Sequence, residues 1–393
     1  MTARLRIAFI GTRGVPAGEG GVERHVEELG SRLADRGHDV TVYCRTNYVK
    51  ERPATYRGMH LRYVATAGTK HLDFIAHSAA SSVLTLRRPP DIVHYHAIGS
   101  ALVAPLPRYL TRSGIVLTVH GLDYARQKWT GAARAALKLA ERMSARVPHA
   151  TIVVSRALAD HYATRLGREA VYIPNGMPEA TARPLGPIAQ RLGLGGRPYL
   201  LFVGRLVPEK APDLLVRAFA RVEGEARLVI VGSSGFTDEY AESVRLLAAA
   251  DPRAIMAGGV FGDELGELYS NAAAFVLPSS LEGLPITLLE AVAHRAPLIV
   301  SDIPPHLEVV GADGPGHRVV RQGDVEALAA GMASVLRHRD REVAGAAVLF
   351  SQVGAQYSWN AITTATEQVY SRVLARRASR SKAIESSGSE LPV

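Results

Sequence analysis

Short apolar runs alternate with amphipathic stretches along most of the chain. The runs in the first half that are typical of buried strands are 5–10, 39–44, 60–65, 91–96, 114–119, 150–155 and 170–174. Helical patterns separate them at 22–36, 71–87, 132–146 and 156–166. Continuous runs of Val, Ile and Leu are typical of a parallel sheet that helices cover on both faces. The pattern therefore predicts a doubly wound α/β domain in residues 1–178.

The same alternation restarts in the second half, after a Pro- and Gly-rich stretch at 179–197 that we predict to be a linker. Strands are predicted at 199–204, 227–232, 274–279 and 297–302, and helices at 212–222, 237–250, 263–271, 285–294 and 323–337. Residues 198–357 thus form a second Rossmann-like domain. We expect the two domains to face a central cleft lined by the loops that follow the strands.

The C-terminal part of the chain has a different pattern. An amphipathic helix is predicted over 358–377, and we expect it to cross back to the N-terminal domain. Residues 378–393 are small, polar and charged, so a disordered tail is predicted there.

Composition narrows the class of protein. The 393 residues suit two domains, and the single cysteine, Cys44, excludes an intrachain disulfide and a cysteine-based metal site. No apolar run reaches the roughly 18 residues that span a bilayer, and the N-terminal run is too short for a signal peptide, so we expect a cytoplasmic protein. The net charge of +9 favours anionic partners such as phosphorylated substrates or acidic lipid head groups.

A glycine-rich loop, "GTRGVPAGEGG", follows the first predicted strand. Glycines let the backbone approach a ligand, and the next helix points its amide-rich N-terminus at the same place, which makes Gly20 and Gly21 candidate binding residues. A dinucleotide fingerprint is not present, because the glycine spacing differs and the second strand is followed by Arg45 rather than an acid. A turn needed only for packing is the alternative.

Histidines stand at the ends of two strands. His120 follows the strand at 114–119, where an imidazole can bind a sugar hydroxyl or a developing charge, or only cap a neighbouring element. Asp123 and Lys128 follow in the same loop. His94 and His96 share one face of a strand, but a third ligand is missing nearby in sequence, so no metal site is predicted.

The loop after the first strand of the second domain, "GRLVPEK", carries Arg205 and Lys210. Two fixed cations can neutralise a diphosphate and stabilise the charge on a leaving group. A solvated charged loop is the alternative.

The stretch "SSLEGLPITLLEAVAH" follows another strand and begins a helix near Pro285. Gly283 and Leu284 would present backbone N–H groups to a phosphate, and Glu282 would lie beside them. Glu290, eight residues after Glu282, could reach a second group of one extended ligand, such as a ribose diol. Spacing alone also fits two solvated acids or a hydrolase carboxylate pair.

Taken together, these motifs resemble the retaining nucleotide-sugar glycosyltransferases of family 4, which have the GT-B fold. The resemblance covers about residues 5–375 and rests on "GGVERHVEEL", "TVHG", "IPNGM", "VGRLVPEK", "LVIVG" and "PSSLEGLPITLLEA". The last of these places Glu282 and Glu290 in the E-x7-E motif of the family. The N-terminal region also resembles a bacterial branch that includes rhamnosyltransferases and other enzymes of surface-polysaccharide assembly.

The resemblance implies a role for each matching residue. Arg205 and Lys210 would bind the donor diphosphate and Glu290 the ribose. Glu282 would contact the donor sugar, and His120 the sugar being transferred. The other expected donor contacts are Gly20, Gly21, Gly232, Val260, Gly283 and Leu284. The residues expected on the acceptor side are Glu23, His96, Asp123 and Lys128.

The resemblance also implies the reaction. A hexosyl or deoxyhexosyl group would pass from a nucleotide-diphosphate sugar to a hydroxyl of a glycan or lipid-linked acceptor, with retention. No D-x-D motif occurs in the sequence, so we expect no essential metal and no other cofactor. The rival functions are a nucleotide-sugar epimerase and a non-catalytic nucleotide-sugar-binding protein. A nucleic-acid partner is not expected, since no known binding motif is present.

Two further features bear on partners and on the site. Residues 125–147 hold six basic residues and one acid, which predicts an amphipathic helix that docks on an anionic membrane surface or a merely solvated face. Departures from the family pattern occur at "AHRAP", which includes His294, and at His306. We expect both to change loop shape without touching the core motif.

Overall fold

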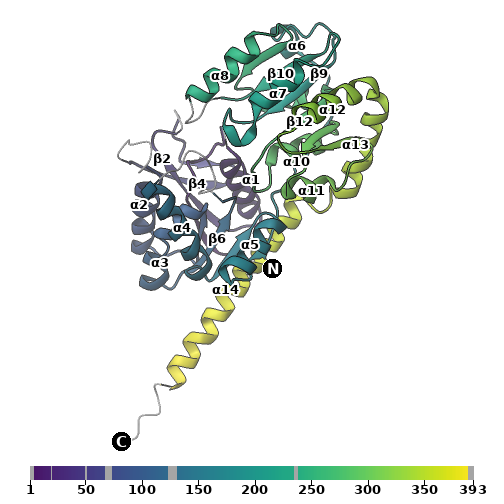
Figure 1. Cartoon of the computed structure of the whole chain (residues 1–393). Helices are drawn as coiled ribbons and strands as arrows, with labels where there is room; N and C mark the ends of the chain where they lie inside the picture. Colours follow the sequence, from purple (N-terminus) through teal and green to yellow (C-terminus); the bar gives the residue numbers. More distant parts are fainter. Residues whose placement is uncertain are drawn as a thin grey trace, which may run out of the picture. The chain divides into compact units, whose positions relative to one another are not determined.

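The computed structural model describes residues 4–18, 20–48, 51–66, 73–122, 131–233 and 238–387 (Figure 1). The described residues form two compact units. Unit 1 runs to Pro174 and resumes at Trp359, and unit 2 is Asn175–Ser358. The boundary therefore lies a few residues before the expected position at 178.

Unit 1 contains, among the described residues, an eight-stranded sheet of order β3-β4-β2-β1-β5-β6-β7-β8. Its strands are β1 (Arg6–Ile10), β2 (Asp39–Arg45), β3 (Thr55–Tyr56), β4 (Met59–Val64), β5 (Ile92–His96), β6 (Gly114–Val119), β7 (Ala150–Val153) and β8 (Val171–Tyr172). Neighbouring strands pair in parallel, except that β3 is antiparallel to β4. The seven predicted strands are present, and β3 is too short for its pattern to show in the sequence.

Helices cover this sheet (Figure 1). They are α1 (Gly21–Asp35), α2 (Asp73–Arg87), the 3-10 helix η1 (Ile98–Leu102), α3 (Pro105–Leu110), α4 (Gly131–Arg146), α5 (Arg156–Leu166) and α14 (Trp359–Ser387). One group consists of α1 and α14, which contact each other, and a second consists of α2 and α4, which both contact η1. Local signals set the ends of α5: the Ser155 side chain accepts from the Leu158 N–H, and Gly167 ends the helix with φ 61°.

The C-terminal helix α14 belongs to the core of unit 1. Its buried residues share one apolar cluster with the strands and with α1; they are Trp359, Ile362, Val369, Tyr370 and Val373. The helix continues to Ser387, so residues 378–387, for which disorder was predicted, are helical. The physical reason is that the sequence has neither glycine nor proline from Trp359 until Gly388, so nothing stops the helix earlier.

Unit 2 contains, in its described part, a six-stranded sheet of order β11-β10-β9-β12-β13-β14 with parallel pairing throughout. The strands are β9 (Tyr199–Val203), β10 (Arg227–Val231), β11 (Ala254–Gly258), β12 (Ala274–Leu277), β13 (Leu298–Ser301) and β14 (His317–Val320). The sequence did not predict the two edge strands β11 and β14. Both are less completely buried than the central strands, so they lack the continuous apolar run of those strands.

The helices of unit 2 are η3 (Pro208–Lys210), α6 (Pro187–Arg191), α7 (Pro212–Phe219), α8 (Asp238–Ala249), α9 (Gly262–Asn271), α10 (Ile286–Ala293), α11 (Pro304–Val310), α12 (Val325–Arg337) and α13 (Arg339–Val353). The expected linker, 179–197, contains α6 and is tied to α9. The Gly186 N–H donates to Glu267 (3.0 Å), and the Asn271 amide donates to the Arg183 carbonyl (2.7 Å). This stretch is therefore part of unit 2 and not a free linker.

Both sheets have a point where the strand order reverses. In unit 1 the chain winds from β1 through β2 to β4, then returns to β5 on the other side of β1. In unit 2 it winds from β9 to β11, then returns to β12 beside β9. The two loops that leave such a switch point part from each other at the carboxyl edge of the sheet, which is where ligands bind in this architecture. Ligand sites are therefore expected at the β9/β12 and β1/β5 switch points.

Candidate functional site

Three loops meet at the β9/β12 switch point of unit 2. The Ser280 N–H donates to the Glu209 carbonyl (2.8 Å), which joins the loop after β12 to the loop after β9. The Leu206 N–H donates to the Ser233 carbonyl (3.0 Å), which joins the loop after β9 to the loop after β10. The structure thereby brings together the backbone segments that carry the predicted residues Arg205, Lys210 and Glu282.

Gly232 is needed for this arrangement. Its φ is +151°, and a Cβ atom there would lie 1.9 Å from the carbonyl oxygen of Gly204. Any side chain would therefore push apart the loops after β9 and β10. This gives Gly232, which was predicted as a donor-binding residue, a defined structural reason to be glycine.

A buried ion pair lies between two of these loops. The Lys210 ammonium is 2.5 Å from Glu282 Oε1, and the two side chains are only 13% and 10% exposed. Burial raises the pKa of Glu282, but the charge and hydrogen bond of Lys210, together with the nearby His306, leave the pKa below its ordinary value of 4.5. Glu282 is thus ionised at neutral pH, and an anion that bound Lys210 would compete with this carboxylate.

His306 lies close to the ion pair. It is fully buried in α11, and its Nδ1 is 3.0 Å from the Ser301 carbonyl oxygen. Burial lowers the pKa of His306 to about 4, and the Glu282 charge opposes the shift, so the two side chains are electrostatically coupled. The expectation that His306 leaves the core motif untouched was wrong. The reason is topological, because α11 begins at the carboxyl end of β13, the same edge of the sheet from which the loop after β12 leaves.

Glu290 is held in place by an aromatic neighbour. The buried Tyr269 hydroxyl donates to Glu290 Oε2 at 3.1 Å. The Tyr269 ring stacks on His294, with ring centres 5.6 Å apart and planes 10° apart. His294, the other departure from the family pattern, therefore also supports the motif and does not merely alter loop shape. The carboxylate of Glu290 is half-buried and oriented before any ligand binds.

The N-terminus of α10 points its amide groups into the same region. Pro285 precedes the first helical residue, and Gly283 and Leu284 stand just before it. The buried side chain of Asn175 donates to the Leu284 carbonyl at 2.7 Å and so fixes this turn. Asn175 was not predicted from the sequence, where its only signal was a polar residue in "IPNGM" after an apolar run.

Two other predicted donor contacts, Arg205 and Val260, would offer different chemical groups to a ligand. Arg205 is half-buried in the loop after β9, and its side chain or backbone already takes part in a polar, ring or electrostatic contact within the protein. The Val260 side chain is buried, and the neighbouring Phe261 side chain is 51% exposed. Val260 can therefore offer a ligand its backbone, whereas Phe261 offers an aromatic face.

The glycine-rich loop at the β1/β5 switch point is braced by α1. The Arg13 N–H and the Arg13 Nε both donate to Glu23 Oε1 at 3.1 Å. A Cβ on Gly20, whose φ is +118°, would lie 2.1 Å from Glu23 Oε2. Glu23 was expected on the acceptor side, but its buried carboxylate is occupied in holding the loop. Gly21 is the first residue of α1.

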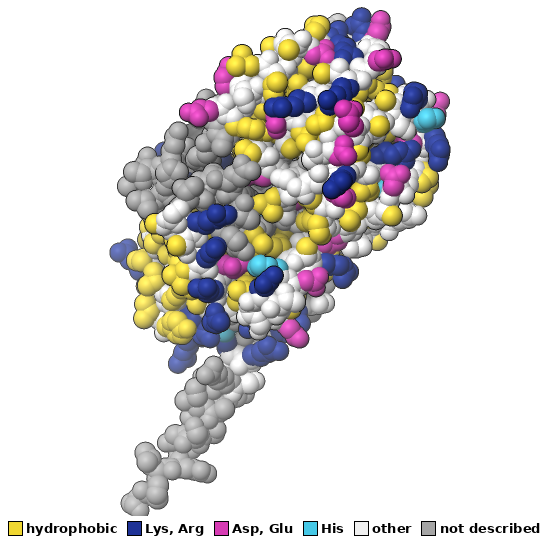
Figure 2. Space-filling view, in the orientation of Figure 1, with side chains coloured by type: hydrophobic (Ala, Val, Ile, Leu, Met, Phe, Trp, Pro, Cys, Tyr) yellow, Lys and Arg dark blue, Asp and Glu magenta, His cyan; other side chains and the backbone are white. Residues whose placement is uncertain are grey.

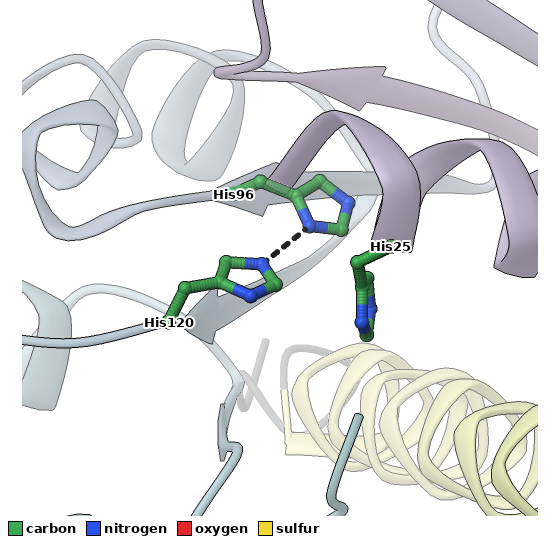
Figure 3. Close-up of side chains that lie close together, drawn as sticks. All are labelled: His25, His96 and His120. Carbon is green, nitrogen blue, oxygen red and sulfur yellow. Dashed lines mark hydrogen bonds between the residues drawn. The ribbon is translucent and has the colours of Figure 1, made fainter. Parts of the chain in front are cut away.

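Three histidines gather beside this loop (Figure 3). His25 comes from α1, His96 is the last residue of β5, and His120 follows β6. His96 Nδ1 is 3.2 Å from His120 Nε2. His96, which was expected on the acceptor side, is fully buried and its imidazole contacts His120. Asp123 and Lys128 lie outside the described residues.

The imidazoles of His96 and His120 are neutral at physiological pH. Burial, followed by the neighbouring histidines, places the pKa of His96 well below 6.5. Burial and the nearby His25 do the same to His120. A neutral imidazole has one donor and one acceptor nitrogen, so His120 can orient toward a hydroxyl group without bringing a positive charge.

Comparison with known proteins agrees with the two-unit architecture. Residues 19–180 match the family model described as glycosyltransferase family 4, and residues 188–345 match glycosyl transferases group 1. The GDP-mannose-dependent alpha-(1-6)-phosphatidylinositol monomannoside mannosyltransferase of Mycobacterium tuberculosis is 30% identical over 378 residues, covering 89% of this chain and 94% of that protein. The glycogen synthase of the same organism is 28% identical over 407 residues, covering 93% and 94%.

Solved structures share the fold at lower identity. Sucrose-phosphate synthase from Thermosynechococcus elongatus has a TM-score of 0.81 at 22% identity and covers 95% of this chain and 100% of its own. HepE from Anabaena, crystallised with UDP and glucose, has a TM-score of 0.79 at 16% identity and covers 94% and 100%. These neighbours confirm the predicted pair of parallel-sheet, Rossmann-like domains.

The Lys210–Glu282 pair predicts a pH-dependent contribution to the stability of unit 2. Because the pKa of Glu282 is lowered on folding, the contribution is complete above about pH 5 and is lost as pH falls through the folded value. Glu282→Gln should cost unit 2 about 3 kcal/mol near pH 7 and progressively less in acid. The test is to measure the difference in the free energy of unfolding, which is the gap between the wild type and Glu282→Gln, at a series of pH values. The matched control is Glu326→Gln on the surface of α12, and a gap that stayed constant with pH would contradict the assignment.

Proposed function

This chain belongs to glycosyltransferase family 4, and from that premise we propose that it transfers a glycosyl group from a nucleotide-diphosphate sugar to an acceptor hydroxyl with retention of configuration. One observation carries the proposal. The buried Lys210–Glu282 pair lies at the β9/β12 switch point, where the amide-rich start of α10 is also placed. A cation and free helical N–H groups at one edge suit a phosphorylated ligand.

The donor would be bound through its charged and polar parts. Lys210 and Arg205 neutralise the diphosphate, and their fixed charges stabilise the leaving group as the glycosidic bond breaks. Glu290, with one oxygen already held by Tyr269, accepts from a ribose hydroxyl. Glu282 contacts the donor sugar, because an arriving phosphate releases it from part of its interaction with Lys210.

We propose attack from the same face as the leaving group. The bond from the anomeric carbon to the diphosphate breaks, the bond to the acceptor oxygen forms, and the leaving phosphate takes the acceptor proton. His120 contacts the transferred sugar as a neutral hydrogen-bonding group. A covalent cysteine intermediate is unsuited to this chain, since burial raises the pKa of its one cysteine, Cys44, to about 11. We propose no essential metal, because the fixed cations neutralise the diphosphate.

The acceptor we propose is a glycan or a lipid-linked sugar of bacterial surface polysaccharide or glycolipid assembly. The mycobacterial relative named above, which acts on a phosphatidylinositol mannoside, supports the glycolipid alternative. Transfer of a hexose or deoxyhexose fits both, and the rhamnosyltransferase branch stays a prediction. We also propose that the enzyme works in the cytoplasm, on the inner face of the membrane.

Surface charge supports the membrane part of this proposal. Every charged residue exposed on α4 is basic, and Arg134, Lys138, Arg142 and Arg146 recur every four positions, so they share a broad stripe. The one acid of the helix, Glu141, is buried against His161 (2.8 Å). Tyr109 and Leu110 of α3 are 71% and 67% exposed.

Figure 2 shows hydrophobic and basic side chains together on the face that carries α2, α3 and α4. Such a mixture suits the interface of an anionic bilayer, where aromatic and apolar side chains enter the head-group region and cations remain outside. None of the helices within the described ranges has the length and apolarity to cross a bilayer. We therefore propose surface docking of a helix face.

Transfer assays test the function directly. We expect Glu290→Ala and Arg205→Ala to raise the donor KM at least about 10-fold or to abolish transfer, since each removes a charged hydrogen bond worth roughly 1.5–3 kcal/mol. The matched controls are Glu326→Ala and Arg217→Ala, which change exposed residues of unit 2. Release of free nucleoside diphosphate should require an acceptor and should persist in EDTA.

The same assay separates the rival functions. An epimerase would alter the sugar without releasing nucleotide, and a binding protein would do neither. Wild-type turnover of both site variants at low donor concentration would show that the site assignment is wrong, and loss of transfer in EDTA would show that metal independence is wrong.

Vesicle sedimentation tests the membrane surface. With vesicles of 30% phosphatidylglycerol in phosphatidylcholine, we expect wild-type protein to sediment. We expect Lys138→Glu/Arg142→Glu/Arg146→Glu to lose at least about 100-fold in affinity, at roughly 1 kcal/mol per basic residue. The control Arg217→Glu/Arg221→Glu/Arg245→Glu makes the same change of net charge on unit 2. Equal binding of the two variants, or no binding of the wild type at physiological salt, would rule out docking through α4.

A further inference from the structure

The three histidines of unit 1 are spaced as metal ligands. One ring nitrogen from each of His25, His96 and His120 lies within 4.8 Å of the other two. The closest pair, His96 Nδ1 and His120 Nε2, is 3.2 Å apart. Nitrogen atoms bound to a tetrahedral Zn²⁺ at about 2.0–2.1 Å are about 3.3 Å from each other. One edge of the ligand triangle therefore has the length that a bound ion requires, and a His25 nitrogen lies within 4.8 Å of the other two ligand atoms.

Neighbouring side chains hold the three ligand histidines in position. His96 ends a central strand and is backed by the His94 ring, which stacks on it at 4.4 Å. His94 is itself held on both nitrogens, 2.7 Å from the Tyr370 hydroxyl and 2.7 Å from the Thr118 hydroxyl. His25 lies on α1 and packs against Trp359. The His25 and His120 rings meet nearly at right angles, with planes 77° apart and ring centres 4.7 Å apart (Figure 3).

The chemistry of the three groups favours a transition metal. Transition metals bind an imidazole through a ring-nitrogen lone pair, and three such nitrogens lie together here. Three nitrogens without a carboxylate suit Zn²⁺, Cu²⁺ or Ni²⁺ and not Mg²⁺ or Ca²⁺. His120 is partly exposed, and this leaves a fourth position open to water.

We propose that His25, His96 and His120 form a binding site for Zn²⁺ or a similar transition-metal cation, and that the bound metal inhibits sugar transfer. Inhibition follows because a His120 nitrogen that coordinates a metal no longer bonds the transferred sugar. This second part rests on the proposed function, whereas metal binding does not. The metal is an effector here and has no role in the transfer reaction.

The surroundings also set the strength of binding. Within the described part of the chain, no group hydrogen-bonds His96 Nε2, although it is buried. A metal-bound histidine usually donates its second N–H, and loss of that partner costs about 10–100-fold in affinity. The site should therefore bind reversibly and be emptied by EDTA, as suits a regulatory or inhibitory ion.

Binding is tested first, without any enzyme assay. Untagged, metal-free protein is titrated with CoCl2 and followed by visible absorption, and with ZnCl2 by calorimetry. We expect one ion per chain and the intense visible bands of tetrahedral Co²⁺. His25→Gln and His96→Gln should each weaken Zn²⁺ at least about 10-fold, and His338→Gln, on the surface of unit 2, should not. Melting curves of each variant show whether it is folded. Unchanged affinity in folded His25→Gln and His96→Gln, or no Co²⁺ bands in the wild type, would overturn the site.

Inhibition is tested second, in the transfer assay. Stoichiometric Zn²⁺ should lower wild-type turnover, and EDTA should restore it. In His25→Gln, which keeps His120, the same Zn²⁺ should have little effect. Equal inhibition of wild type and His25→Gln would refute the link between this site and activity. If no transfer is seen at all, the proposed function fails, while the titrations still decide the metal site.

Discussion

Parallel strand pairing is the constraint on which the rest of this molecule depends. A parallel neighbour requires a crossover, so each strand ends at the same edge of its sheet and sends a loop out from there. The winding reverses beside β9 and beside β1, so the connections after two neighbouring strands turn away in opposite directions there. No crossover covers the space between them, and their polar groups can contact a ligand. Lys210 and Glu282 come from the two loops of one switch point. His25 and His96 follow the two strands of the other.

Close packing at these edges determines which of the polar side chains are charged and which are neutral. At the β9/β12 edge the Lys210–Glu282 pair is buried, and breaking it would leave a charge without compensation. The histidines respond differently, since burial keeps His96, His120 and His306 neutral. The result is one edge with fixed charges, suited to a diphosphate, and another with neutral imidazoles, suited to hydroxyl groups or to a metal ion.

The central strands and the loop residues after them could be predicted from the sequence, because buried parallel strands are continuous apolar runs and ligand residues follow them. Arg205, Lys210, Glu282 and Glu290 were predicted as site residues in this way. The edge strands β11 and β14 were missed, since less complete burial removes the apolar signal. The helix α6 was mistaken for linker because Pro and Gly flank it.

Contacts between residues far apart in the sequence were beyond prediction. The sequence showed His94 and His96 together but gave no sign that α1 would bring His25 to His96. It likewise gave no sign that His306 would approach Glu282. In each case the partners meet only after the sheet has formed, and the order of its strands is what places them.

The central claim is that the Lys210–Glu282 edge of unit 2 binds the diphosphate of a nucleotide, and one calorimetric titration tests it most directly. UDP, GDP, TDP and ADP are each titrated into the wild type and into Lys210→Met. We predict that at least one nucleotide binds the wild type, and that Lys210→Met weakens that nucleotide at least about 10-fold, the value of one charge-assisted hydrogen bond. If no nucleotide binds the wild type, or if Lys210→Met binds it equally well, the account is contradicted.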